Sequence, residues 1–360
     1  YAQQVLAAGY TSIVDPTTTG RVSLAVRDAI NAGWYVGPRI TASGRQLTSR
    51  QGLADWYPEW IGVPDTSIGV LVQSRDEAIE IIRRQVKDGV DLIKIDFDGT
   101  QVNPRTGHLS ACFNQDEADA MVAEAHRLGR PVFAHAVDQE AVLYAARAGC
   151  EVIFHAYDIC DDGLEAMLKN GCHICPSLTF PYNTVDFTRP SDPCYGWRPA
   201  RKGGVIERAV EVLNRARAAG VPFLVGTDSG FAVTPYGEWH ARELQIMVDD
   251  LGFSPEAALE ASTAGNAQML RQRGQVGELG IGKLADFLVV NGDPVADIAI
   301  LQQRAAIEAV YLGGRKVELT LPDRPLDYPW EHNHSQWNEV YTRDRVAGLH
   351  FFNPAPVMTL

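Results

Sequence analysis

The sequence predicts an α/β protein, namely a TIM-type (β/α)8 barrel that lacks its first strand, with part of a small β-sandwich domain. Short apolar runs rich in β-formers alternate with helical stretches through the first 272 of the 360 residues. A glycine recurs at the end of successive helical stretches, as expected of helix C-caps that lead into the next strand. The alternative fold is a doubly wound open sheet, which usually binds its ligand near a glycine-rich turn. No G-x-G-x-x-G turn follows the first strand, and this absence disfavours the alternative.

Seven apolar runs are predicted strands, and together they fit an eight-stranded barrel from which one strand is missing. The runs are Ser12–Asp15, Arg39–Ala42, Asp91–Phe97, Val132–Ala136, Val152–Ala156, His173–Leu178 and Phe223–Asp228. The predicted helices between them include Arg75–Asp88, Gln115–Leu128, Gln139–Ala148 and Gly204–Ala219. Regular β–α alternation implies a parallel sheet with helical crossovers.

Three regions are expected along the chain. Residues 1–272 form the barrel, in which two long connections, Ser43–Val70 and Thr179–Gly203, follow strand ends and are candidate lids. Residues 273–320 read as strands and turns and are the expected remnant of a β-sandwich domain. Residues 321–360 have little periodicity and are expected to be an irregular tail, in which the role of the segment Gly348–Met358 is left open.

Composition limits the classes of partner. A net charge of −13 argues against nucleic-acid binding, which needs a basic face to neutralise phosphates. No apolar run approaches the roughly 18 residues of a membrane span. Six cysteines spread along the chain do not form a disulfide scaffold, so we expect a reducing, cytoplasmic location. The expected partner is a small-molecule substrate, and whether the protein is a homo-oligomer is left open.

Lys94 is the first candidate site residue, because it lies within the apolar run Asp91–Phe97. A lone buried ammonium is costly, so the side chain needs a partner or a special role. One alternative is an ion pair with Asp96 or Asp98, or a strand-end lysine that reaches solvent. The functional alternatives are a Schiff-base amine or a carboxylated lysine whose carbamate bridges two metal ions.

His135 and His155 occupy matching places in two neighbouring predicted strands, VFAHA and VIFHA. A lone histidine in a strand is more often a core residue than a ligand. Two histidines one βα repeat apart can both point to the same end of a barrel, and imidazole suits zinc and related divalent ions. We therefore interpret both as metal ligands.

Asp228 ends the last predicted strand and is followed by Ser229 and Gly230. It could serve as a simple helix N-cap. Alternatively it contacts a metal ion and the attacking water, and acts as the catalytic general base. Lysine, two histidines and an aspartate on separate strands form the kind of constellation that a metal-dependent hydrolase uses.

At this point the chain resembles the amidohydrolase superfamily, closest to its prolidase-like and imidazolonepropionase-like branch, which hydrolyses amide and related C–N bonds. The matching segments are the strand with Lys94, the two histidine strands, the GTDSG segment with Asp228, Ser254–Leu270 and Gly277–Pro294. The resemblance implies a distorted TIM barrel and two divalent metal ions, with zinc expected, bridged by carboxylated Lys94. It also implies that His135 and His155 bind the second ion and that Asp228 binds the first.

The chain departs from this family pattern in two places. The family carries a His-x-His pair on its first barrel strand, before the region where this chain begins, so we expect the sequence to be N-terminally truncated. His332 and His334 form a His-x-His pair, but polar and aromatic flanks disfavour them as a replacement. Many relatives carry a glycine-flanked histidine in the segment that here reads ASGRQLTSRQGLADW, so the substrate preference does not carry over.

The function expected from these residues is metal-dependent hydrolysis of an amide or related C–N bond in a dipeptide-like, N-acyl or cyclic amide substrate. His240 and Tyr236 follow the last strand and are candidate substrate contacts, although His240 could equally be a surface residue at a helix start. Two alternatives are metal-assisted decarboxylation or C–C cleavage on the same barrel, and a non-catalytic fragment with an incomplete metal centre.

Overall fold

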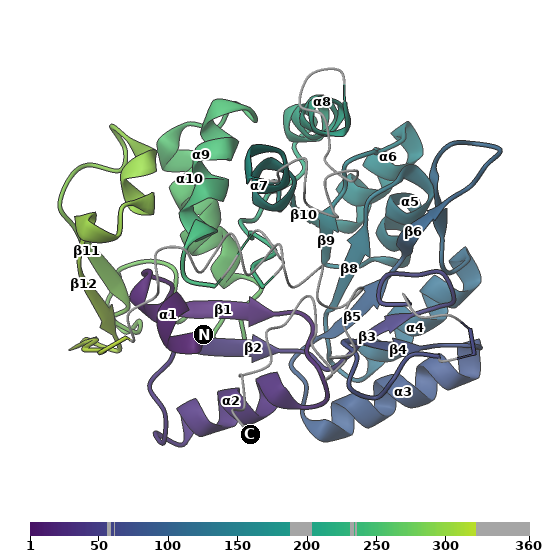
Figure 1. Ribbon diagram of the computed structural model, residues 1–360, viewed down its shortest axis with the longest axis horizontal. Helices are drawn as coiled ribbons and strands as arrows, with labels where there is room; N and C mark the ends of the chain where they lie inside the picture. Colours follow the sequence, from purple (N-terminus) through teal and green to yellow (C-terminus); the bar gives the residue numbers. More distant parts are fainter. Residues whose placement is uncertain (56–58, 61, 188–203, 231–233, 235, 322–360) are drawn as a thin grey trace.

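The computed structural model describes residues 1–55, 59–60, 62–187, 204–230, 234 and 236–321 (Figure 1). Its centre is a parallel sheet in which each strand pairs with the strand of the next βα unit along the chain. The strands β5 (Ile93–Asp96), β8 (Val132–Ala136), β9 (Val152–His155) and β10 (His173–Cys175) lie side by side in that order. A doubly wound sheet would reverse this order at a switch point. The strand order therefore supports a singly wound, barrel-like arrangement.

Further strands continue the sheet at both ends. β3 (Gln46–Thr48) pairs with β5 and with β4 (Gly69–Leu71). β1 (Ser12–Asp15) and β2 (Arg39–Ala42) form a separate parallel pair, which meets the start of β5 where the Asp91 amide donates to the Ala42 carbonyl at 2.7 Å. At the other end Phe223 makes one parallel bridge to Ile174 in β10. Backbone pairing among the described strands does not close them into a ring.

Helices α3 (Arg75–Asp88), α4 (Gln115–Arg127), α5 (Gln139–Ala148) and α6 (Asp161–Asn170) connect these strands and cover the outer face of the sheet (Figure 1). Their ends follow local sequence signals. Asn114 and Glu117 form a capping box at the start of α4. Gly89, Gly149 and Gly171 end α3, α5 and α6 in the left-handed conformation that glycine tolerates. The predicted helix caps at these three glycines are confirmed.

The other helices flank the sheet. They are α1 (Ala2–Ala7), α2 (Val22–Asn31), α7 (Thr179–Phe187), α8 (Val205–Ala218), α9 (Arg242–Asp249) and α10 (Pro255–Glu260), with the π-turn Ala261–Gly265 and the 3-10 turns Trp239–Ala241, Ile298–Gln302 and Arg304–Ala306. No helix in the described ranges is both long and apolar enough to span a membrane.

Two predicted connections and one predicted strand need correction. The connection Ser43–Val70, expected to be a loop, contains β3 and the start of β4, and the described part of the connection Thr179–Gly203 is the helix α7. The predicted strand Phe223–Asp228 is wrong as a regular strand, because only Phe223 pairs with β10. Its next backbone groups bind a side chain instead: the Val225 amide donates to Oδ1 of Asn266 at 2.9 Å, and Nδ2 of Asn266 donates to the Val225 carbonyl at 2.8 Å.

A hairpin that the sequence did not predict follows β5, formed by β6 (Asp98–Val102) and β7 (Leu109–Ala111). Near the C-terminus, β11 (Phe287–Val290), β12 (Ile307–Leu312) and β13 (Arg315–Lys316) form an antiparallel sheet beside α1 (Figure 1). The predicted strands after residue 273 are confirmed in type. The tail from residue 322, with His332 and His334, lies outside the described residues.

Candidate metal centre

Residues from both ends of the parallel strands line one cavity of about 1860 Å³, among them Ser12 and Asp15 of β1 and Val152 and His155 of β9. All four predicted metal-site residues line it, namely Lys94, His135, His155 and Asp228. Three of them come from β5, β8 and β9, which are adjacent in the sheet, and Asp228 comes from the segment after Phe223, which bridges to β10. The structure therefore brings together in space residues that are up to 134 positions apart (228 − 94) in the sequence.

Lys94 lies in the middle of β5 with only 5% of its surface exposed. Its Nζ is 3.4 Å from Oδ1 of Asp96 and 4.9 Å from the ring centre of Phe154. Burial lowers the pKa of Lys94, and the charges of Asp96 and Asp228 oppose this shift. The contact with Asp96 that the sequence left open is present, and the lowered pKa shifts the side chain toward the neutral, nucleophilic amine.

His135 and His155 lie on adjacent strands with their ring centres 4.7 Å apart in an edge-to-face arrangement. Burial lowers the pKa of each imidazole well below its usual value, and the positive charge of Lys94 lowers both further. Both rings are therefore neutral near pH 7, and each has one nitrogen lone pair that a divalent cation can bind.

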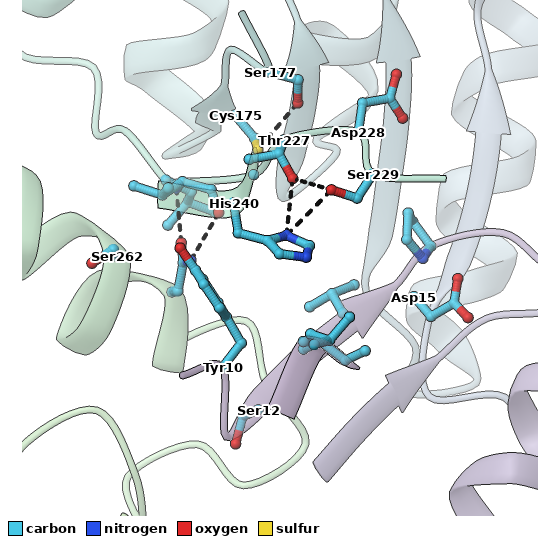
Figure 2. A pocket seen from close by; sticks show the side chains of 18 of the residues that line it. Tyr10, Ser12, Asp15, Cys175, Ser177, Thr227, Asp228, Ser229, His240 and Ser262 are labelled. Atoms are coloured by element: carbon cyan, nitrogen blue, oxygen red, sulfur yellow. Dashed lines mark hydrogen bonds between the residues drawn. The ribbon is translucent and has the colours of Figure 1, made fainter. Parts of the chain in front are cut away.

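Asp228 lines the cavity next to Thr227 and Ser229 (Figure 2). Its carboxylate is accessible from the cavity, which protein surrounds. The resulting desolvation raises the pKa of Asp228, and the positive charge of Lys94 opposes this shift. Its backbone is held at a φ of +53°, and His155 at the end of β9 has a φ of +73°. Left-handed backbone at non-glycine residues is costly and tends to occur at functional sites.

Two carboxylates in this region were not predicted as site residues, Asp96 and Asp98. Both are completely buried, and burial raises the pKa of each to about 7. Within the described residues, Oδ2 of Asp96 and Oδ1 of Asp98 have no hydrogen-bond partner. The pattern Asp96-Phe97-Asp98 after Lys94 is the sequence signal that could have identified them. From the sequence, both carboxylates are expected only as ion-pair partners of Lys94.

His240 and Tyr236, the predicted substrate contacts, both line the cavity. The Gly237 amide donates to Nε2 of His240 at 2.9 Å, so Nε2 is an acceptor and the proton of the neutral ring is on Nδ1. Nδ1 faces the hydroxyls of Thr227 at 3.3 Å and Ser229 at 3.2 Å (Figure 2). His240 is thus tied to the segment that carries Asp228, and burial lowers its pKa to about 4.

A second group of metal-ligating side chains lies on the loops beyond these strand ends. His108, Asp138 and Asp158 place one donor atom each within 4.8 Å of one another. Nδ1 of His108 is 2.9 Å from Oδ1 of Asp138, while Oδ2 of Asp138 accepts the Leu109 amide. These contacts attach the β6–β7 hairpin to the start of α5, so the group has a structural role. No sequence pattern indicated this group, because the hairpin itself was not predicted.

Lys94, His135, His155 and Asp228 thus place an amine, two imidazoles and a carboxylate on the wall of one cavity. Residues 1–317 match the family model described as "Amidohydrolase family". The chain therefore belongs to the amidohydrolase family, as its resemblance to that superfamily predicted.

Named relatives support the same conclusion. Ochratoxinase of Aspergillus niger is 27% identical over 328 residues, which cover 87% of this chain and 66% of that protein. The chain thus spans slightly less than two thirds of this curated relative. A solved Xaa-Pro dipeptidase with bound methionine is 28% identical with a TM-score of 0.75, over 88% of this chain and 77% of that one. The crystal structure of A. niger ochratoxinase has a TM-score of 0.73 at 26% identity, over 88% and 73% of the two chains.

Proposed function

We propose that this protein hydrolyses an amide or related C–N bond of a small substrate with the help of divalent metal ions. The observation that carries the proposal is the convergence of Lys94, His135, His155 and Asp228 on one cavity. His135 and His155 lie at or next to the C-terminal ends of β8 and β9, which is the end of the strands where active sites of (β/α)8 barrels lie. We accordingly interpret the sheet as an eight-stranded barrel without its first strand.

The side chains present fit a divalent metal centre. Two neutral imidazoles, a buried lysine and buried carboxylates with oxygens that lack hydrogen-bond partners are the donors expected for zinc or a similar ion. We propose that Lys94, His135, His155 and Asp228 hold two ions, with Zn²⁺ the expected metal. When bound, such ions polarise a carbonyl group and lower the pKa of water.

Lys94 is proposed to be carboxylated. Burial lowers its pKa and so favours the neutral amine, whose nitrogen can form a bond to the carbon of CO₂ and release a proton. The resulting carbamate would be an anion whose two oxygens could each serve as a metal ligand. The same change removes an ammonium from an apolar strand, where it is costly.

Asp228 is the proposed general base. Its position on the cavity wall and its raised pKa suit a group that takes a proton from water and passes it to the leaving nitrogen. Tyr236 and His240 lie on the same wall and are proposed to contact the substrate. Because both nitrogens of His240 are engaged within the protein, this contact would use the face or edge of its ring.

The substrate class follows from the relatives and from the cavity. The similar proteins include one named as a Xaa-Pro dipeptidase and one named as an ochratoxinase. The cavity is large, at about 1860 Å³. We propose a dipeptide-like, N-acyl or cyclic amide substrate.

The test compares the purified protein with the variants Lys94→Ala and Asp228→Asn. Lys94→Ala is expected to lose bound metal, measured by inductively coupled plasma mass spectrometry. Asp228→Asn is expected to reduce hydrolysis of a panel of dipeptides and N-acyl amino acids by about 10²–10⁴-fold, the usual contribution of a general base.

Lys87→Ala and Asp88→Asn are matched controls, because both side chains are exposed at the end of α3. They should keep full metal content and rate. If Lys94→Ala and Asp228→Asn retained the metal and the activity in full, the proposed function would be wrong.

A further inference from the structure

The imidazole of His240 is held in one orientation by the chain around it. It lies in the 3-10 turn that precedes α9 with 9% of its surface exposed, and the ring of Tyr10 packs 4.9 Å from it. The Gly237 amide donates to its Nε2 at 2.9 Å. Gly237 in turn lies against α1, because a side chain there would come within 2.9 Å of Cβ of Gln4. The ring is therefore anchored on the side of α1.

The contact with Gly237 decides which nitrogen of His240 carries the proton. A backbone N–H can only donate, so Nε2 must accept, and a proton on Nε2 would clash with the proton of the amide. A neutral imidazole has one N–H, which is therefore on Nδ1. The hydrogen-bond geometry alone thus leaves a donor on Nδ1.

This donor faces the two residues on either side of Asp228. Nδ1 lies 3.2 Å from Oγ of Ser229 and 3.3 Å from Oγ1 of Thr227, and these two hydroxyl oxygens are 2.7 Å apart. Figure 2 shows both hydroxyls turned toward His240, while the Asp228 carboxylate points away from the ring. One imidazole thus holds both neighbours of the proposed general base.

The segment that carries Asp228 depends on such contacts because it lacks regular strand pairing, with a single bridge from Phe223 to β10. Asp228 itself has a φ of +53°, a conformation that is costly for a residue other than glycine and persists where surrounding contacts hold it. The Thr234 hydroxyl donates to the Asp228 carbonyl at 3.0 Å. That contact holds the main chain of Asp228, whereas His240 holds the side chains next to it.

We propose that His240 is a positioning residue, which binds Thr227 and Ser229 through Nδ1 and so holds the Asp228 carboxylate in its place at the cavity. The catalytic consequence rests on the proposed function, in which Asp228 moves a proton. The hydrogen bonds and the placement of Asp228 exist in the metal-free protein. A positioning role acts through the two hydroxyls, whereas a contact of the ring with substrate does not depend on them.

Nitrogen-15 NMR of the imidazoles in metal-free protein tests the anchoring of the ring. The measurement is made at pH 7.5, well above the His240 pKa of about 4. The His240 signal is identified by its loss in His240→Gln. We expect the Nδ1–H tautomer, because Nε2 accepts the Gly237 amide. An Nε2–H tautomer would overturn the proposal, because the Gly237 amide could then not hold the ring.

The variant His240→Gln tests the placement of Asp228. Its amide oxygen can take the place of Nε2 and accept the Gly237 amide, but no donor remains at the place of Nδ1. Crystal structures of the metal-free wild type and variant should show the Asp228 carboxylate displaced by about 1 Å, a shift that can cost about 10²-fold in rate. If the carboxylate stayed in place, the proposal would be wrong. If His240→Gln does not fold, Thr227→Val with Ser229→Ala gives the same comparison.

Kinetics of the zinc-loaded protein test whether His240 acts through the hydroxyls. On the best substrate of the dipeptide and N-acyl amino acid panel, kcat should fall on the order of 10²-fold in His240→Gln, with little change in KM. Thr227→Val with Ser229→Ala should lower kcat to a similar extent. Adding His240→Gln to that protein should cause no further loss, because residues that act through one network are not additive. Losses that multiply would show that His240 acts independently and would overturn the proposal.

His126→Gln is the matched control, because His126 is exposed on α4 and pairs with Glu151. It should leave both kcat and the placement of Asp228 unchanged. A wild-type protein that hydrolyses no compound of the panel would instead contradict the proposed function, since the spectra and the crystal structures alone decide whether His240 positions Asp228.

Discussion

At the scale of single residues, Glu243 shows how burial competes with hydrogen bonding. Its side chain has no exposed surface and accepts the backbone amides of Leu178 at 2.9 Å and Thr179 at 2.7 Å, and the Thr179 hydroxyl at 2.6 Å. Burial raises its pKa to about 7, although these hydrogen bonds and Arg242 oppose the shift. Glu243 thus fixes the chain just after β10 but keeps its proton to an unusually high pH.

This raised pKa predicts a pH-dependent stability. The unfolded chain ionises Glu243 near pH 4.5 and the folded protein near pH 7, so between these values the folded state binds more protons. The contribution of Glu243 is therefore fully present below pH 4.5 and is lost as the pH rises to 7. Relative to Glu243→Gln, the free energy of unfolding of the wild type should fall by on the order of 3 kcal/mol across this window.

Urea unfolding of both proteins at several pH values between 4.5 and 8 measures this difference. Subtraction of the two curves removes the titration of every other group that the substitution leaves unchanged. A difference that stays constant with pH would show that Glu243 titrates normally in the folded protein.

At the scale of elements, a buried ion pair joins α2 to the strands. Nη1 of Arg27 contacts Oδ2 of Asp91 at 2.8 Å and the Gly89 carbonyl at 2.9 Å, and the same Asp91 oxygen accepts the Ala42 amide. The two side chains are 7% and 13% exposed. This network links the end of α3, the start of β5 and the end of β2.

Arg27→Met should destabilise the protein by about 3 kcal/mol, because it leaves the buried Asp91 carboxylate without its main partner. Arg84→Met is the control, since Arg84 pairs with Glu80 on an exposed face of α3. Exposed pairs contribute little, so the control should change stability by less than about 1 kcal/mol. Guanidinium unfolding midpoints measure both effects, and equal losses would contradict the role given to the buried pair.

The sequence predicted elements well wherever local signals were complete. The strands Ser12–Asp15 and Val132–Ala136 and the helices Arg75–Asp88 and Gln139–Ala148 have the predicted bounds, because apolar periodicity and caps coincide there. The sequence did not predict the structure where backbone hydrogen bonding depends on residues distant in the chain. Phe223–Asp228 reads as a strand, but the amide of Asn266, some forty positions later, takes its backbone hydrogen bonds.

The candidate site, too, could be predicted from the sequence only in part. Lys94 and the two histidines stand out because polar residues in apolar strands are rare and costly. Asp98 does not stand out, since its position follows the strand and its contact with His135 is set by the register of β5 against β8. No local pattern in the sequence shows which carboxylate meets which imidazole.

At the scale of the whole molecule, the C-terminal sheet is attached to the main sheet by a few specific contacts. Nη1 of Arg39 in β2 binds Oδ2 of Asp286 at 2.8 Å, and Oδ1 of Asp286 accepts the Gly313 amide in the turn after β12. The Asp286 side chain is only 3% exposed. One ion pair thus joins the first βα units to strands nearly 250 positions later in the sequence.

Arg39→Ala should loosen the C-terminal sheet before the rest of the protein. Loss of a charge-assisted hydrogen bond worth about 1.5 kcal/mol should raise native-state proteolysis within residues 287–316 about tenfold. Arg315→Ala, an exposed change on β13, is the control and should have little effect. Fragment mapping by mass spectrometry locates the cleavage. If cleavage rose equally over the whole chain, the ion pair would stabilise global folding instead of attachment of this sheet.

The chain order of the candidate site has a consequence for biosynthesis. Lys94, His135 and His155 belong to neighbouring strands that can pair as soon as they leave the ribosome, whereas Asp228 is added 73 residues (228 − 155) later. At roughly 5–20 residues per second this interval is about 4–15 s. A nascent chain would therefore expose three of the proposed metal donors before it has the carboxylate proposed to move protons, so that under this proposal metal loading can precede catalytic competence.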